Sequence, residues 1–342
     1  MSAPRVSVIM PNYNHAESLR RSIAAVRAQT LPAHEILFID DRSIDDSVAI
    51  ATAAGVRVAS TPVNSGPAAA RNLGARLATG DVLLFLDSDI ELAPTVIERA
   101  TALLDACPEA GAVCGMLDDV PIERESLLQE CRCLQAHYWR ISSEGVVSFL
   151  FSAICAMRAD VFAEVGPFDE RLRETEEVEY GQRLSTRYQV LLTSALSGRH
   201  RDEPRLWPLL RKVFHRTRLR VPLYTKRRRF ATGFETSARV FGSVAATAAV
   251  LSLPVILAGA FFALIPAALL AVSVGCDADM YRFVFRRRGI AFGLFFTGVQ
   301  VLQNVAIMAG AGFGALQWLV SREFRGLYDH APQPRPVLLD VA

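Results

Sequence analysis

The sequence has almost no net charge and no long apolar run near its start. Its 342 residues include 37 Lys and Arg against 35 Asp and Glu. This balance gives no reason to expect a nucleic-acid partner. Without an early apolar run we expect no cleavable signal peptide, and we expect membrane insertion to be directed from the C-terminal part of the chain.

Cysteine is sparse and unpatterned. The six cysteines include Cys131 and Cys133, but they lack the paired Cys-x-x-Cys or Cys/His spacing of zinc sites. We therefore expect neither a zinc site nor a disulfide framework, and we expect reduced thiols, as is usual in the cytosol.

Charged residues are missing from two long stretches, 240–276 and 289–321. Apolar stretches of this length predict transmembrane helices. As one helix, residues 240–275 would be about 54 Å long at 1.5 Å per residue, well beyond a hydrocarbon core of about 30 Å. We therefore expect a hairpin that turns near residues 257–260.

The preferred topology has three spans, over about 240–257, 260–276 and 290–310. A hairpin returns Arg286, Arg287 and Arg288 to the side of the N-terminal part, as the positive-inside rule requires, and leaves the tail, 321–342, outside. The glycines of residues 310–314 could instead break the last helix, so two or four spans stay open. Polar residues of this segment, Gln300, Gln303 and Asn304, are expected to face other helices.

The segment 205–239 links the two parts. Residues 205–229 contain ten Lys or Arg and no acidic residue, with apolar side chains interspersed. This pattern is typical of a segment lying at an anionic membrane surface. A solvated or nucleic-acid-binding run is the alternative, and the adjacent spans favour the membrane.

The N-terminal part alternates short apolar strands with amphipathic helices. We expect strands at 6–10, 35–39, 56–60 and 82–86 and helices at 16–28 and 47–54. This alternation predicts an α/β fold with a mostly parallel sheet flanked by helices. The polar residues that follow its strands would converge on one crevice; they are Tyr13, Asp40, Asp41, Asp87 and Asp89.

Asp87 and Asp89 directly follow the apolar run 82–86. Strand alternation would point both carboxylates the same way, so that they could hold one ion. Hard oxygen ligands suit Mg²⁺ or Mn²⁺ bridging a diphosphate. The alternative is an acidic loop that caps the next helix.

Five segments in order carry a specific resemblance to a known family. They are Val6 to Asn14; Asp40-Asp41-Arg42-Ser43-Ile44-Asp45; Asn64-Ser65-Gly66-Pro67 to Ala70-Arg71-Asn72-Leu73-Gly74; Asp87-Ser88-Asp89; and Gly166-Pro167-Phe168-Asp169-Glu170 with Glu176-Glu177-Val178-Glu179. Together they resemble family 2 glycosyltransferases of the GT-A nucleotide-sugar-binding fold. The resemblance covers about the first 190 residues. Arg42 stands where glycine is common, and Glu177 where aspartate is more usual.

The resemblance implies a role for each position. Pro11, Tyr13 and either Asp40 or Asp41 would hold the nucleoside base, although either aspartate could simply bond turn N–H groups. Gly66 would permit close backbone approach, and Arg71 would meet a phosphate or support the fold through an ion pair. The implied metal ligands for Mg²⁺ or Mn²⁺ are Asp89, Asp87, which would also lie near the ribose, and His200, for which a purely structural role is the alternative.

Glu177, beside Glu176, is the candidate general base for an inverting transfer. Its alternative is a solvated acidic helix start. The resemblance thus predicts a catalytic domain over residues 1–204. The charge-free stretches and the positive-inside rule predict that this domain lies in the cytoplasm and is anchored in the inner membrane by several spans. It would move sugar from a nucleoside diphosphate donor to a hydroxyl of a lipid-linked or membrane-proximal acceptor.

Two other functions stay open. A polyprenyl-phosphate glycosyltransferase would attack with a phosphate oxygen and need no strong base, and a degenerate protein would only bind sugar nucleotides as a membrane scaffold. A processive synthase is disfavoured because no Gln-x-x-Arg-Trp motif follows the acidic pair.

Overall fold

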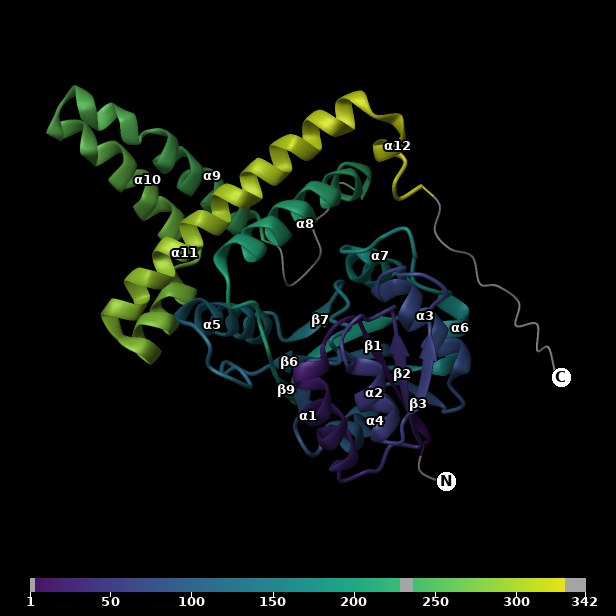
Figure 1. Cartoon of the computed structure of the whole chain (residues 1–342). Coiled ribbons are helices and arrows are strands. Elements are labelled where there is room, and N and C mark those ends of the chain that lie inside the picture. The colour runs from purple at the N-terminus through teal and green to yellow at the C-terminus, as the bar shows by residue number, and fades with distance from the viewer. Residues whose placement is uncertain (1–3, 228–235, 330–342) are drawn as a thin grey trace. The chain divides into compact units, whose positions relative to one another are not determined.

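The computed structural model describes residues 4–227 and 236–329. They divide into two compact units, which are treated separately below (Figure 1). The first contains the chain up to Asp118 and Ser143–Arg201, and the second contains Asp119–Ser142 and Asp202–Asp329. Residues 119–142, expected within the N-terminal domain, thus group with the C-terminal helices.

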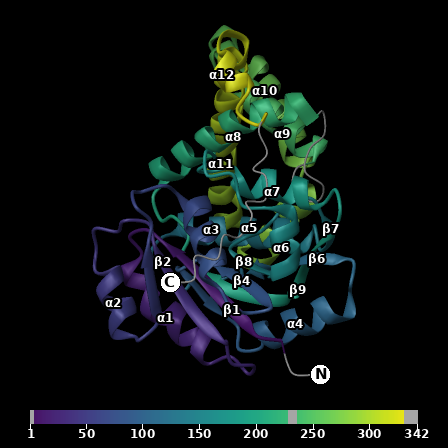
Figure 2. The same cartoon turned by 90° about the vertical axis from the view of Figure 1, so that its right-hand side faces the viewer.

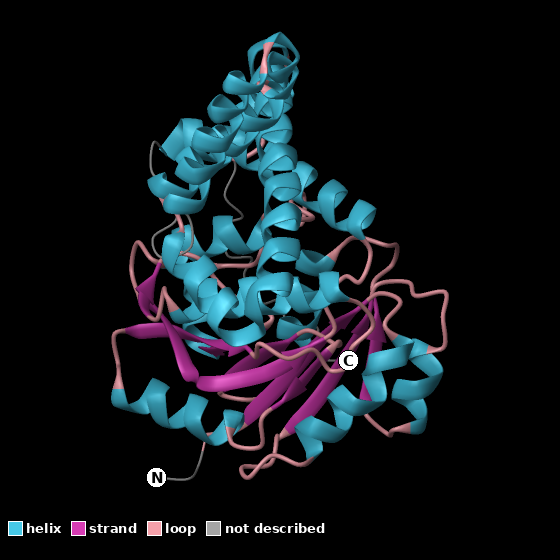
Figure 3. Ribbon diagram, turned by 90° about the vertical axis from the view of Figure 1, so that its left-hand side faces the viewer, coloured by secondary structure: helices cyan, strands magenta, loops and turns pink. Residues whose placement is uncertain are grey.

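The first unit is built on one nine-stranded mixed sheet (Figure 3). Its order is β3-β2-β1-β4-β8-β6-β9-β5, with β7 paired to β9. The stretch β3-β2-β1-β4 is parallel, and β8 runs antiparallel to β4. The strands are β1 (Val6–Asn12), β2 (Glu35–Asp40), β3 (Arg57–Ser60), β4 (Val82–Leu86), β5 (Ile90–Leu92), β6 (Ala110–Leu117), β7 (Gly145–Val147), β8 (Ile154–Arg158) and β9 (Gln189–His200).

Helices cover both faces of this sheet, because alternate strand residues point to opposite sides. Val8, Met10 and Phe38 share one core with the apolar faces of α1, α2 and α4. On the other face α3 packs so closely that a Cβ at Gly74 would lie 2.3 Å from Ile9. The helices are α1 (Ala16–Arg27), α2 (Ser47–Ala53), α3 (Pro67–Leu77), α4 (Val96–Ala106), α6 (Ala159–Val165) and α7 (Glu176–Leu184), several of which are labelled in Figure 2.

The second unit is helical. A proline at residue 254 ends α9, and the chain continues through two short 3-10 turns to α10. The helices are α5 (Leu127–Ile141), α8 (Leu206–Arg227), α9 (Ser237–Leu251), α10 (Leu264–Gly275), α11 (Ala278–Val320) and α12 (Arg322–Arg325), and the 3-10 turns are Leu253–Ala258 and Ala260–Ala263.

The chain reverses at Gly259, whose φ of 149° favours glycine. Helices α9 and α10 then pack together, with Ser273 Oγ donating to the Gly242 carbonyl over 2.8 Å. Two segments, Ser237–Ala258 and Ala278–Val320, are long and apolar enough to cross a membrane, whereas Ala260–Gly275 is shorter. Three crossings therefore stay a prediction.

Helix α11 kinks at Gly289, where φ is 82°, and then continues to Val320. The break considered at residues 310–314 is wrong, because these glycines serve packing. A Cβ on Gly310 would lie 2.5 Å from the Phe214 carbonyl of α8, and one on Gly314 would lie 2.8 Å from the Arg218 carbonyl.

The polar residues of α11 do face other helices, as expected. Gln300 and Gln303 are buried and bond to Gln135 and Arg132 of α5. Asn304 accepts a hydrogen bond from Ser243 of α9 over 3.0 Å. These bonds join α5 to the C-terminal helices and explain the grouping of residues 119–142.

Candidate active site

Polar side chains tie together the ends of the parallel strands. Asn12, at the end of β1, donates to Ser43 Oγ over 3.0 Å and accepts from Ser88 Oγ over 2.8 Å. Asn12 and Ser88 are almost fully buried. The loops after β1, β2 and β4 are thereby fixed at one edge, where open α/β sheets bind ligands.

The two aspartates at the end of β2, Asp40 within the strand and Asp41 just after it, support the loops around them. Asp40 accepts from the Ser43 N–H at 3.2 Å to each oxygen. Asp41 accepts from the backbone N–H groups of Ser65 and Gly66, at 2.8 and 2.7 Å. The bonding of turn N–H groups considered from the sequence is therefore present at both aspartates.

Arg42 adopts a φ of 66°, in the left-handed region. Glycine enters this region without cost, which explains why glycine is common at this position in the resembling family. The Arg42 Nε donates to the Pro62 carbonyl over 3.0 Å.

The residues expected near the nucleoside lie at the same sheet edge. Pro11 is buried beside β2, whereas Tyr13 is 47% exposed just beyond β1. Gly66, with a φ of 90°, precedes the first turn of α3 and is held there by Asp41.

Arg71 of α3 is buried, only 3% exposed, and lies among several carboxylates. It donates to Asp87 over 2.9 Å and to Glu176 over 3.0 Å, and lies 3.8 Å from Glu177. Burial by itself would lower the pKa of Arg71, but the charges of Asp87 and Glu176 outweigh it and raise that pKa above its usual value. Of the two sequence alternatives, the structure shows the ion pair.

The implied metal ligands are only partly assembled. Asp89 lies 3.1 Å from Nε2 of His200, and 3.9 Å from Nδ1 of His15. Asp87 faces Arg71 and keeps 32% of its side chain exposed. Within residues 4–227 and 236–329 no cluster of three or more potential metal-ligating side chains is assembled. The donor set nevertheless fits a hard divalent cation, since it offers two carboxylates from one strand end.

The three glutamates at the start of α7 lie in different environments. Glu176 is buried against Arg71, and Glu179 is buried in a two-bond ion pair with Arg183 at 3.0 and 2.9 Å. Glu177 keeps 27% of its side chain exposed and accepts a hydrogen bond from Ser152. Only Glu177 of the three thus combines an anchored carboxylate with access to solvent.

Asn72 fixes the turn that leads to this helix. It bonds to both the N–H and the carbonyl of Phe168, each at 2.9 Å, and donates to Glu170. The turn begins at Gly166, whose φ is 88°. Two motifs about 100 residues apart are thereby locked together.

Sequence reasoning missed Ser152 and His15. Ser152 belongs to no motif, and only the antiparallel placement of β8 beside β4 brings it to Glu177. His15 could have been found, because it directly follows the loop at the end of β1.

Comparisons with known proteins agree with this architecture. Residues 7–166 match the model of glycosyl transferase family 2. The chain contains a family 2 glycosyltransferase domain. It is 28% identical over 225 residues to a pre-mycofactocin glycosyltransferase of Mycobacterium tuberculosis, covering 61% of this chain and 46% of that protein. It is 30% identical over 209 residues to the succinoglycan biosynthesis protein ExoO of Rhizobium meliloti, covering 59% of each.

A third relative matches over a shorter stretch. The undecaprenyl-phosphate 4-deoxy-4-formamido-L-arabinose transferase of Sodalis glossinidius is 39% identical over 109 residues, 29% of this chain and 33% of that protein. The chain thus spans less than two thirds of the length of each of these three relatives.

A solved structure shares the fold over most of the chain. The mannosyltransferase of Pyrobaculum calidifontis, solved with GDP-mannose and Mn²⁺, superimposes with a TM-score of 0.56 at 17% identity, covering 94% of this chain and 89% of the other. The glycosyltransferase domain therefore has the GT-A fold, and long helices follow it.

Proposed function

We propose that this protein is an inverting, metal-dependent glycosyltransferase that moves a sugar from a nucleoside diphosphate donor to a hydroxyl of a lipid-linked or membrane-proximal acceptor. The observation that carries the proposal is the difference among the glutamates of α7. Glu176 and Glu179 are buried against arginines, whereas Glu177 is anchored by Ser152 and partly exposed.

In the proposed reaction, Glu177 accepts the proton of the acceptor hydroxyl while the hydroxyl oxygen attacks the anomeric carbon. The new oxygen–carbon bond forms as the bond from that carbon to the diphosphate oxygen breaks, and the nucleoside diphosphate leaves with the electron pair. Ser152 and Arg71 hold the base in position, since both lie against its carboxylate.

The donor would lie over the strand ends. Pro11, Tyr13 and either Asp40 or Asp41 would contact the base, with Gly66 allowing the backbone to approach. The existing bonds of Asp40 and Asp41 to turn N–H groups leave lone pairs for one further donor. Arg71 would act through Asp87 and Glu176 instead of reaching a phosphate itself.

Asp89, Asp87 and His200 would hold Mg²⁺ or Mn²⁺, which when bound would supply Lewis-acid neutralisation of the departing diphosphate. The carboxylate oxygens are the harder donors of the set. Contact between Asp89 and Nε2 of His200 supports this assignment, because both side chains already face each other.

A polyprenyl-phosphate acceptor is the second candidate, favoured by the name of the Sodalis relative. A phosphate oxygen is already ionised at neutral pH, so this reaction would not depend on Glu177. A catalytically inactive sugar-nucleotide-binding scaffold would show neither transfer nor such a dependence.

The apolar C-terminal segments support a location in the inner membrane, with the domain of residues 1–204 in the cytoplasm. Whether α9 and α10 cross or enter as a hairpin without crossing, they return the arginines at 286–288 to their starting side. Helix α8, in the segment 205–239, would lie along the membrane surface.

The product tests the proposal. Purified full-length protein would be incubated with radiolabelled UDP-, GDP- and dTDP-sugars and total membrane lipid, and organic-extractable products separated. Label in an alkali-stable lipid is the expected result. A mild-acid-labile phosphodiester would establish the polyprenyl candidate, and no labelled product with any donor would favour the scaffold.

A further inference from the structure

The start of α11 is an amphipathic helix between two charge-free stretches. Residues 277–288 carry the charges, and residues 240–276 and 289–321 on either side carry none. Met280, Tyr281 and Val284 are buried in one cluster with residues of α5. The opposite face is exposed and basic, the arrangement of a helix that lies at a membrane interface.

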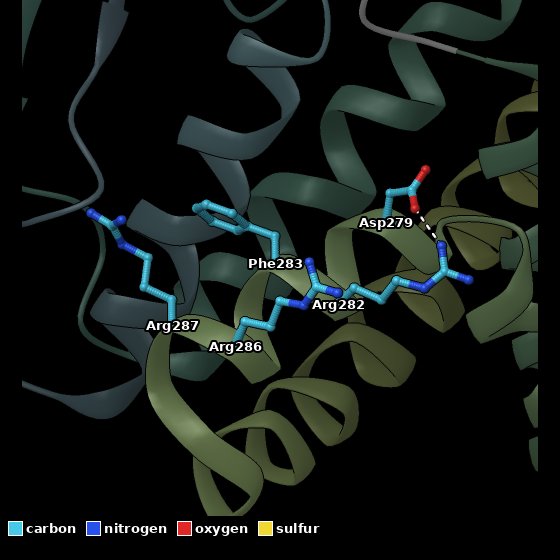
Figure 4. A pocket seen from close by; sticks show the side chains of 5 residues that line it. All are labelled: Asp279, Arg282, Phe283, Arg286 and Arg287. Carbon is cyan, nitrogen blue, oxygen red and sulfur yellow. Dashed lines mark hydrogen bonds and ion pairs between the residues drawn. The ribbon is translucent and has the colours of Figure 1, made fainter.

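This exposed face forms an open cleft of about 490 Å³, lined by Asp279, Arg282, Phe283, Arg286 and Arg287 (Figure 4). Three arginines and one carboxylate thus line the cleft. The walls of the cleft also include the Phe283 ring, whose centroid is 5.8 Å from the guanidinium carbon of Arg287.

The three arginines differ in how far their charge is already satisfied. Arg282 pairs with Asp279 at 2.5 Å, and Arg287 pairs with Asp119. In the part of the chain that the structure describes, Arg286 has no hydrogen-bond or ion-pair partner. In Figure 4 the Arg286 side chain extends toward the base of the Arg282 side chain, whereas the Arg282 guanidinium lies beside Asp279.

The side chains that line the cleft indicate which class of ligand it would bind. Planar guanidinium groups match the oxygens of a phosphate, and an apolar ring beside them favours a phosphate that is joined to an apolar body. Large apolar side chains follow directly after the Gly289 kink, with Ile290 73% and Leu294 63% exposed. Basic pockets beside membrane segments on the cytoplasmic side are suited to anionic headgroups.

We propose that this cleft binds the phosphate headgroup of an anionic membrane phospholipid. The proposal depends on the membrane placement proposed above but not on sugar transfer. A bound lipid would hold the Gly289 kink at the headgroup level, because the headgroup sits at the arginines and its acyl chains run beside the apolar residues that follow.

The test measures lipid binding directly. Full-length protein in detergent would be titrated with short-chain phosphatidylglycerol, and dissociation constants read by native mass spectrometry. Arg286→Gln should weaken binding about five- to tenfold, and Arg282→Gln with Arg286→Gln further still. Arg322→Gln is the matched control, since it removes an exposed arginine at the start of α12, just beyond the far end of α11; it should leave the affinity unchanged.

Several results would overturn the proposal. Equal phosphatidylglycerol affinity for wild type and Arg286→Gln would exclude the cleft as the binding site. An equal loss of affinity in Arg322→Gln would show that binding is unspecific charge attraction. Equally tight binding of short-chain phosphatidylcholine would exclude recognition of the anionic headgroup. Full displacement by millimolar inorganic phosphate would assign the cleft to free phosphate. Because no donor is present, failure here is distinct from failure of glycosyl transfer.

Discussion

Arg71 joins the end of β4 to the start of α7, and its removal should destabilise the first unit strongly. Arg71→Met keeps a long apolar side chain but orphans Glu176, whose side chain is only 5% exposed. Breaking a buried ion pair on one side costs about 3–5 kcal/mol, because an uncompensated charge remains. Asp87 adds less to this cost, since 32% of its side chain already reaches solvent.

A loss of that size should lower the thermal midpoint by about 6–20 °C for a domain of 150–250 residues. Thermal unfolding of the full chain in detergent would measure it. The loss should shrink as the pH is lowered, because protonation removes the orphaned charge. Adding Glu176→Gln to Arg71→Met should restore most of the stability, as a double-mutant cycle would reveal.

Arg76→Met provides the matched control, because Arg76 is exposed on the same helix. It should change the free energy of unfolding by less than about 0.5 kcal/mol. An Arg71→Met protein as stable as the Arg76→Met protein would refute the view that Arg71 holds the acidic cluster together.

Three further predictions concern the metal, the backbone and the membrane. Asp89→Asn should lose most activity and most Mn²⁺ binding measured by electron paramagnetic resonance while the fold persists; full turnover in EDTA would end the metal proposal. Arg42→Gly should be about 1 kcal/mol more stable than Arg42→Ala, because both lose the bond to Pro62 but only glycine relieves the left-handed φ; equal stability would contradict this. Single cysteines replacing Arg76, Arg282 and Arg322 in a cysteine-free background should react with an impermeant maleimide in intact cells only at 322; labelling at 282 would exclude the hairpin.

The sequence predicted the fold of the N-terminal part well, because strong periodicity and motif order agree there. The expected strand 82–86 coincides with β4, and the expected helix 16–28 with α1 to within one residue. Strands β5 to β9 were not predicted, since their pairing is long-range and carries no local signal.

The local sequence could not show whether a glycine in an apolar helix allows close packing or breaks the helix. From the sequence, residues 310–314 could have formed a helix break, whereas in the structure Gly310 and Gly314 admit the backbone of α8. The real kink is at Gly289, a single glycine beside three arginines. Likewise, the motif around Arg71 did not reveal its partners, because Asp87 and Glu176 are joined to it only by folding.

The role of Glu177 can be tested by comparing transfer with donor binding. Glu177→Gln removes proton acceptance with little change in size, so transfer should fall roughly 10²- to 10⁴-fold, while donor affinity measured by calorimetry stays within about twofold. Ser152→Ala should show a smaller loss of transfer, because the carboxylate would lose its anchor. Wild-type turnover in Glu177→Gln, with undiminished donor binding, would contradict the central claim that this carboxylate is the base.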